Sequence, residues 1–232
     1  MEEKFLSIVM PVYNEQDIAE KMINDYYEKV LSKFNKWEFI IVNDRSTDNT
    51  FQILQKIKER LPITIINNEV NLGHGPTLMK AYEAAKGELI FHTDSDYQNE
   101  PTDFWKLYEN IEKNDLVIGV RSSRKDPLHR LILTLIVRMI ILFIYRVNIP
   151  DANSPFRLMK KGMLDQFLSR TEDSALIPSI FMSLFASKRK FRVMYIPVTH
   201  YPRKTGKTVI VKWKLIKFCL NAFKQLIRYK FS

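Results

Sequence analysis

The chain has 232 residues, of which 46% are hydrophobic and 27% are charged. This length accommodates one sizeable α/β domain with an appendage and excludes two full-sized domains. The composition excludes a disordered or low-complexity polypeptide. The single cysteine, Cys219, excludes an internal disulfide and a cysteine-based zinc site, and it fits a reducing compartment.

Charge is divided unevenly along the chain. Residues 1–115 contain 13 Lys and Arg against 21 Asp and Glu, a net charge of −8, whereas residues 116–232 contain 23 against 5, a net charge of +18. A basic half of this size indicates a polyanionic partner, which can be nucleic acid, anionic lipid head groups or the phosphates of a substrate.

The first half alternates short apolar runs with segments of helical periodicity. Helices are predicted within Gln16–Lys33 and Ser46–Arg60, where apolar residues recur every three or four positions. Strands are predicted at Phe5–Val12, Trp37–Val42, Ile63–Asn67, Glu88–Thr93 and Asp115–Arg121. This alternation predicts an α/β fold, a mostly parallel sheet with helices on both faces.

Four polar segments directly follow the first four predicted strands. In parallel sheets, ligands bind beyond the carboxyl ends of the strands, so these segments are expected to form a site at one edge of the sheet. They are PVYNE (Pro11–Glu15), NDRSTDNT (Asn43–Thr50), NEVNLGHGP (Asn68–Pro76) and DSDYQNEP (Asp94–Pro101).

The N-terminus and the longest apolar stretch bear on localisation. The chain begins with acidic residues, and the apolar run Phe5–Val12 is too short for the core of a signal peptide, so a cytoplasmic protein is expected. The stretch Leu131–Val147 contains Arg138 and Arg146, and it is shorter than the roughly 20 uncharged residues of a transmembrane helix. It is expected to lie on a membrane or against the core, with spanning as the minor alternative.

The second half is less regular. The segment DANSPFRL begins at Asp151, and a strand-like run at Phe191–Val198 precedes YPRKTGKT (Tyr201–Thr208). Residues 209–232 are predicted to form a basic helix whose apolar and cationic residues occupy neighbouring stripes, as in helices that lie in a membrane interface. Docking of this helix on its own domain is the alternative. We therefore divide the chain into a domain at 1–208, with halves 1–121 and 122–208, and a C-terminal helix.

Asp94, Asp96 and Gln98 are candidate metal ligands. Residues two apart in an extended segment point to the same side, which brings two carboxylates and an amide oxygen together. Such hard oxygen ligands suit Mg²⁺ or Mn²⁺ shared with substrate phosphates. The alternative is that these residues cap the helix entered at Pro101. The histidines show no metal-binding spacing and are interpreted as structural, with His74 the one placed to line the site.

The four polar segments, in this order, resemble the family 2 glycosyltransferases of the GT-A fold. DxDxQxxP at Asp94–Pro101 is similar to the polyprenyl-phosphate sugar transferase branch, which includes the dolichol-phosphate mannosyltransferase-like enzymes. The resemblance continues through Gly119–Arg121, DxxSPFR at Asp151–Arg157 and PRKTGKT at Pro202–Thr208, so it spans nearly the whole chain. It implies an inverting enzyme that moves a sugar from a UDP- or GDP-sugar to a polyprenyl phosphate on the inner face of a membrane.

The resemblance also implies roles for residues of the donor and metal sites. Asp96 and Gln98 are expected to bind the metal directly, Asp96 as a catalytic residue, and Asp94 to support the metal or the ribose. The base and ribose are expected to meet Pro11, Tyr13, Glu15 and, through a hydrogen bond to the nucleobase, Asp44.

Phosphate-binding positions come from the basic half. The resemblance implies catalytic roles for Arg121, Arg203 and Lys207 and substrate binding by Ser154 and Arg157, since guanidinium groups match phosphate oxygens in pairs. Three positions depart from the common family pattern: Arg45 and Pro155 replace Gly, and Thr208 replaces Ser.

Three other functions are compatible with the sequence. A family 2 enzyme that extends a glycan at a hydroxyl would need a base, for which Glu172 or Asp173 is the candidate. A nucleic-acid-binding module would use the basic half, but its interleaved aliphatic runs favour an anionic membrane surface, and no nucleic-acid partner is expected. The third alternative is a protein that binds a nucleotide-sugar without catalysing its transfer. A homo-oligomer or a separate membrane-protein partner is also compatible with the sequence.

Overall fold

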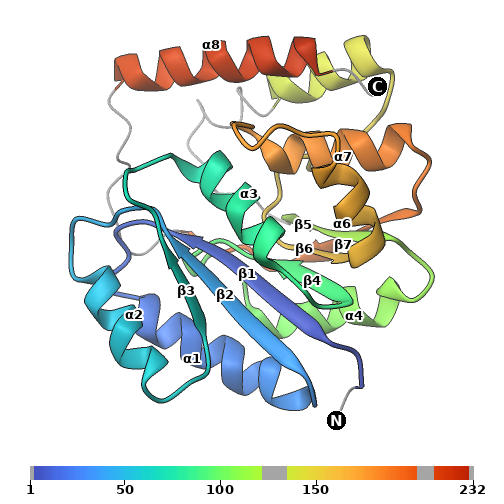
Figure 1. The fold of residues 1–232 in the computed structure, drawn as a ribbon. Helices are drawn as coiled ribbons and strands as arrows, with labels where there is room; N and C mark the ends of the chain where they lie inside the picture. Colours follow the sequence, from blue (N-terminus) through green and yellow to red (C-terminus); the bar gives the residue numbers. More distant parts are fainter. Residues whose placement is uncertain (1–2, 122–134, 203–211, 230–232) are drawn as a thin grey trace.

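The computed structural model describes residues 3–121, 135–202 and 212–229, which surround one central sheet (Figure 1). The sheet has seven strands in the order β3-β2-β1-β4-β6-β5-β7. Every neighbouring pair is parallel except those made by β6, which runs antiparallel to β4 and to β5. The strands are β1 (Leu6–Val12), β2 (Trp37–Asn43), β3 (Thr64–Asn67), β4 (Leu89–His92), β5 (Leu116–Arg121), β6 (Arg157–Lys160) and β7 (Val193–Val198).

Helices cover both faces of the sheet, as the α/β alternation predicted (Figure 1). One face carries α1 (Ala19–Lys29), α2 (Thr50–Lys58) and α4 (Phe104–Ile111), with the 3-10 turns η1 (Leu31–Lys33) and η2 (Pro101–Asp103). The other carries α3 (His74–Ala84), α6 (Lys161–Leu168) and α7 (Pro178–Lys188). A buried hydrophobic cluster lies on each face of the sheet. Alternate residues of β1 pack into one cluster or the other, because successive side chains of a strand point to opposite faces.

The predicted strands are confirmed, and β6 is the one strand that the sequence did not indicate. Its sequence, RLMK, has only two apolar residues between two basic ones, so it forms no recognisable apolar run. It pairs with β4 and β5 on its two sides, with Leu158 opposite both Phe91 and Val117. The first helix begins later than predicted, at Ala19. The backbone N–H groups of Glu15 and Gln16 instead donate to Thr50 Oγ1 and Asp48 Oδ2.

Two helical segments lie together above α3 and α7 in Figure 1. One covers residues 135–140 and continues into the π-helical turn η3 (Ile141–Tyr145), and the other is α8 (Lys212–Arg228). The hydroxyl of Tyr145 donates to the carbonyl of Leu226, and the ring of Tyr229 stacks on Phe181 with 4.3 Å between centroids. The last helix therefore docks on its own domain. Within the described residues, no helix has both the length and the apolar character needed to cross a membrane.

Arg157 at the start of β6 is fully buried. Its Nε donates to the carbonyl of Ser154 at 2.9 Å, its Nη1 donates to that of Ser179 at 2.8 Å, and its Nη2 donates to that of Ala152 at 3.3 Å. Burial lowers the pKa of Arg157, since desolvation penalises the charged form. The guanidinium thus binds three buried carbonyls, and its expected contact with a substrate phosphate stays a prediction.

Replacing Arg157 with Lys tests this structural role. A lysine ammonium cannot reach all three carbonyls, so buried acceptors lose their partners, and we expect the free energy of unfolding to fall by about 2–4 kcal/mol. Urea unfolding followed by circular dichroism measures the change. The same substitution at Arg192, whose side chain is 64% exposed beside Asp115, serves as the control and should cost less than about 0.5 kcal/mol. An unchanged unfolding midpoint in Arg157→Lys would contradict this role.

Gly75 in the first turn of α3 lies directly against the backbone of the segment before α7. A Cβ at this position would be 2.2 Å from the carbonyl oxygen of Ala175 and 2.7 Å from the carbonyl carbon of Leu176. Contacts this short with main-chain atoms force the two elements apart. The absence of a side chain at Gly75 therefore sets how closely the 175–176 segment approaches α3.

Gly75→Ala should lower the free energy of unfolding by about 1–3 kcal/mol, because the added methyl group overpacks this contact. Gly162→Ala is the matched control, since a Cβ there meets no atom within 4 Å and the residue lies in α6. Alanine favours helix over glycine, so the control should be neutral or gain up to about 1 kcal/mol. Chemical denaturation of both variants decides the point; equal stability of the two would contradict the overpacking.

Candidate active site

The loops after β1 and β2 are bound to each other at the carboxyl edge of the sheet. The backbone N–H of Asn14 donates to Ser46 Oγ at 3.0 Å, and the N–H of Thr47 donates to Asn14 Oδ1 at 2.8 Å. Of the residues predicted to border the base and ribose, Pro11 is buried within β1, Glu15 is buried in this loop and Tyr13 is partly exposed. Their contact with a nucleotide stays a prediction.

Asp44, directly after β2, organises the neighbouring loop. Its Oδ1 accepts hydrogen bonds from the Nδ2 of Asn68 at 2.9 Å and from the N–H of Leu72 at 2.8 Å, and its Oδ2 accepts one from the N–H of Gly73 at 2.9 Å. Gly73 has φ +86°, a conformation that favours glycine. The carboxylate therefore holds the 68–73 loop in position for α3, and its predicted bond to a nucleobase stays a prediction.

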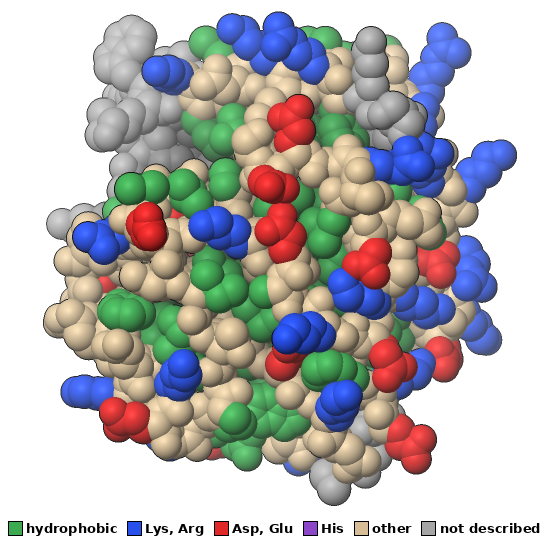
Figure 2. All heavy atoms as spheres, in the orientation of Figure 1, with side chains coloured by type: hydrophobic (Ala, Val, Ile, Leu, Met, Phe, Trp, Pro, Cys, Tyr) green, Lys and Arg blue, Asp and Glu red, His purple; other side chains and the backbone are tan. Residues whose placement is uncertain are grey.

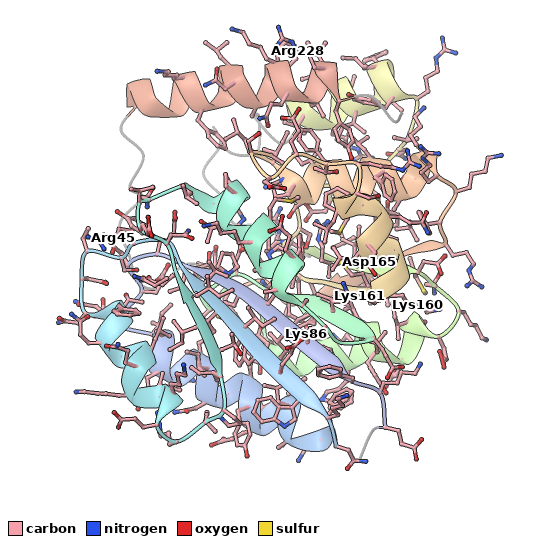
Figure 3. The ribbon with its side chains drawn as sticks, in the orientation of Figure 1. Arg45, Lys86, Lys160, Lys161, Asp165 and Arg228 are labelled. Carbon is pink, nitrogen blue, oxygen red and sulfur yellow. The ribbon has the colours of Figure 1, made fainter. Side chains whose placement is uncertain are left out.

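Three residues of the edge loops adopt left-handed backbone conformations. They are Asn14, Arg45 and Tyr97, with φ of 54°, 59° and 54°, and each follows a strand of the parallel set. Arg45 occupies the position where the family pattern has Gly, and its conformation shows why glycine suits that position. Its side chain is exposed at the outer edge of the loop (Figure 3).

The loop after β4 carries the predicted metal ligands. Asp96 Oδ1 accepts the N–H of Gln98 at 3.2 Å. Two hydrogen bonds join Gln98 to Tyr201. The side-chain Nε2 of Gln98 donates to the backbone carbonyl of Tyr201 at 2.9 Å, and the backbone carbonyl of Gln98 accepts the N–H of Tyr201 at 2.7 Å. On the other side, Glu100 pairs with Lys29 of α1 at 3.0 Å. The acidic loop is thus held between α1 and the start of the basic segment.

Asp94 lies beside two imidazoles. Its Oδ1 is 3.6 Å from His92 Nε2 and 3.9 Å from His74 Nε2. Burial disfavours the charge of Asp94, but the neighbouring His74, His92 and Arg121 outweigh that penalty and hold the pKa of its carboxyl at about 2. Burial lowers the pKa of His92 to about 4, so its ring is neutral at pH 7. Asp94 is therefore an ionised carboxylate with two histidines and an arginine close to it.

Arg121 and Ser154 stand in the second half of the predicted site. Arg121 forms a two-bond pair with Asp151, its Nε 2.8 Å from Oδ2 and its Nη2 2.9 Å from Oδ1. Ser154 is fully buried and its hydroxyl donates to the carbonyl of Gly119, and its expected contact with substrate stays a prediction. Arg121 remains near Asp94, on which its charge acts. Arg203, Lys207 and Thr208 lie outside the described residues.

The two candidate bases for a hydroxyl acceptor lie elsewhere. Asp173 hydrogen-bonds to the carboxyl of Glu83, whose pKa is raised by burial and by that neighbour. Glu83 is nine residues along α3 from His74, which is about 13 Å along the helix axis. Glu172 is exposed and lines a cavity of about 450 Å³ with Arg170 and Arg228.

His92 is the site residue that the sequence interpretation missed. It ends β4, and it lies two positions before Asp94 in the same alternation that relates Asp94, Asp96 and Gln98. This two-residue spacing from Asp94 is the feature of the sequence that could have identified His92. The fold brings the rings of His74 and His92 against Asp94. His74 thus lies at the site where the sequence placed it, and the structural interpretation is corrected for His92.

Comparison with known proteins identifies the family of this chain. The family model described as glycosyl transferase family 2 matches residues 7–168. Two similar relatives are the undecaprenyl-phosphate 4-deoxy-4-formamido-L-arabinose transferases of Salmonella choleraesuis (strain SC-B67) and Salmonella paratyphi B, each 28% identical over 216 residues and 92% of this chain. The chain spans 64% of the length of these curated relatives.

Solved structures share the fold. Glucosyl-3-phosphoglycerate synthase from Mycobacterium tuberculosis, crystallised with Mn²⁺, UDP and glucosyl-3-phosphoglycerate, superposes with a TM-score of 0.72 at 15% identity over 97% of this chain and 80% of its own. TarS residues 1–349 from S. aureus gives a TM-score of 0.59 at 21% identity over 85% and 60%. With the family model covering more than half of its residues, this chain belongs to glycosyl transferase family 2.

Proposed function

We propose that this protein transfers a sugar from a nucleotide-sugar to a polyprenyl phosphate at a membrane surface, with inversion at the anomeric carbon. The observation that carries the proposal is the pairing of Gln98 with Tyr201, which joins the acidic loop after β4 to the residues preceding the basic PRKTGKT segment. The Salmonella relatives, named as undecaprenyl-phosphate sugar transferases, support this acceptor class.

The chemistry asks little of a general base. A phosphate acceptor is anionic at neutral pH, so it can attack the anomeric carbon directly while the nucleoside diphosphate departs. What the protein must provide is positioning of two anions and stabilisation of the leaving group. Arg121, held in a fixed orientation by Asp151, and the basic residues Arg203 and Lys207 would hold phosphates, while the 44–50 and 68–73 loops would form the donor side.

The acidic loop has the donor atoms that a divalent cation requires. Asp94 Oδ1 and His92 Nε2 are buried and have no hydrogen-bond partner among the described residues, so a positively charged group fits beside them. Asp96 and Gln98 would bind Mg²⁺ or Mn²⁺ directly, with Asp94 in support. When bound, the cation supplies positive charge to the departing diphosphate.

An anionic membrane is the proposed location. The exposed apolar side chains of the segment 135–144 and α8 are ten of the fourteen large hydrophobic residues exposed in the described chain: Leu135, Ile136, Met139, Leu142, Phe143, Ile144, Phe218, Leu220, Phe223 and Ile227. The sequences 135–149 and 212–229 contain no acidic residue. Basic side chains gather along α8 in Figure 2, and Arg228 points outward in Figure 3. This membrane-facing surface would bring the site to its lipid acceptor on the cytoplasmic side.

Incubation with UDP- and GDP-sugars, Mn²⁺ and a short polyprenyl phosphate should yield a glycosylated lipid, detected by mass spectrometry. Asp96→Ala should lose Mn²⁺-dependent donor binding and at least about 100-fold in transfer rate while staying folded. Asp165→Ala, the same change at an exposed aspartate of α6, is the control and should retain activity. Transfer only to a saccharide hydroxyl, with no lipid product, would contradict the proposed acceptor.

Sedimentation with vesicles containing anionic phospholipid should bring down the wild-type protein. Phe143 is 72% exposed, and Phe143→Asp removes an apolar anchor, so vesicle binding should weaken by about 10-fold or more. Val70→Asp changes a 61% exposed apolar residue outside the membrane-facing surface and should leave binding intact. Equal loss in both variants, or in neither, would show that this surface does not contact the membrane.

A further inference from the structure

Three potential ligand atoms converge where β4 ends. His74, His92 and Asp94 each bring one ligand atom within 4.8 Å of those of the other two. They come from the first residue of α3, the last residue of β4 and the loop that follows it. The two rings are 6.5 Å apart between centroids and are inclined by 39°. The cluster is assembled by the fold, because 18 positions of sequence separate His74 from His92.

Two of these atoms are buried without a partner in the described part of the chain. His92 is 0% exposed, and neither its Nε2 nor Asp94 Oδ1 makes a hydrogen bond. The two atoms face each other at 3.6 Å, which is longer than a hydrogen bond between them allows. Buried polar atoms are almost always paired, so this gap is suited to a species that both atoms contact.

The far side of the His92 ring is fixed by a buried tyrosine. His92 Nδ1 lies 2.9 Å from the hydroxyl oxygen of Tyr82, and both residues are fully buried. If Nδ1 carries the proton and donates to Tyr82, the lone pair of Nε2 points at Asp94. A hydrogen bond of this kind, from the ring nitrogen that is not a ligand, is typical of metal-binding histidines.

The two distances from Asp94 Oδ1 to the imidazole nitrogens need only a small contraction. Atoms bound to one ion at about 2.0–2.2 Å lie roughly 3.0–3.4 Å from one another. Asp94 Oδ1 is 3.6 Å and 3.9 Å from the two imidazole nitrogens. His74 is 54% exposed, so rotation of its side chain can close the remaining distance without moving the core.

We propose that His74, His92 and Asp94 bind a divalent transition-metal ion of the Zn²⁺, Co²⁺ or Mn²⁺ class in preference to Mg²⁺. Imidazole nitrogen suits these ions, whereas Mg²⁺ prefers oxygen ligands and retains its water. Three protein ligands leave positions open for a substrate oxygen. The inference rests on the proposed function only for its part in catalysis, where Asp94 would connect this ion to the Asp96 and Gln98 side of the loop.

Titration of the metal-stripped 232-residue chain, without nucleotide, tests the site. Isothermal titration calorimetry should show one Zn²⁺ bound at least about 10-fold more tightly than Mg²⁺. Co²⁺ should give a visible absorption spectrum of a site with mixed nitrogen and oxygen ligands. If the wild-type chain binds no metal without nucleotide, or binds Mg²⁺ as tightly as Zn²⁺, the proposal is overturned.

Variants separate the cluster from adventitious binding. His74→Ala changes an exposed residue, is expected to fold, and should abolish the Co²⁺ spectrum. Tyr82→Phe keeps all three ligands but removes the partner of Nδ1, and it should weaken Zn²⁺ binding by about 10–100-fold. Wild-type affinity in His74→Ala would overturn the proposal. Circular dichroism confirms that each variant is folded before titration.

Asp96→Asn distinguishes this inference from the proposed function. It leaves the three ligands in place, so nucleotide-free Zn²⁺ binding should persist while Mn²⁺-dependent binding of the donor is lost. Loss of nucleotide-free binding in Asp96→Asn would count against a site made by His74, His92 and Asp94. A wild-type chain that binds Zn²⁺ as described but transfers no sugar to polyprenyl phosphate would refute the proposed function and leave the metal site standing.

Discussion

Six of the seven strands run in the same direction, and this shared direction places all the polar loops at one edge of the sheet. Backbone pairing fixes the strand ends next to one another, so residues such as Asn14, Asp44 and Asp94 lie at the same edge although they are far apart in sequence. Only β6 runs the other way, and it places Arg157 opposite His92 and Ile118 at this end of the sheet. The pairing of the strands therefore determines which polar loops lie together at this edge.

Several charged groups near this edge are satisfied by the protein itself. Asp44 accepts three hydrogen bonds from the 68–73 loop, Arg121 is paired with Asp151, and Arg157 donates to buried carbonyls. These bonds hold the loops in one arrangement before a ligand arrives, which is the preorganisation that binding and catalysis favour. The exception is the pair formed by His92 Nε2 and Asp94 Oδ1, which the described residues leave without hydrogen bonds.

The sequence predicted the features that local patterns determine. Runs of Ile, Val and Phe marked the strands other than β6, and the polar segments after them marked the edge that carries the site. It could not predict features that depend on the assembled fold. Nothing local distinguishes Arg157, which is buried under carbonyls, from an arginine that faces a phosphate. His74 and His92 become neighbours only after α3 packs beside β4, and β6 is defined by its two partner strands.

The left-handed backbone of Asn14, Arg45 and Tyr97 has a consequence for how this enzyme could adapt to heat. Each non-glycine residue held at positive φ costs about 1–2 kcal/mol relative to an ordinary conformation. The buried sheet core and the hydrogen bonds between the edge loops offset that cost. Glycine would relieve that cost at Arg45, whereas at the other two positions it would also remove the bonds that Asn14 accepts from Thr47 and that Tyr97 donates to Asp25.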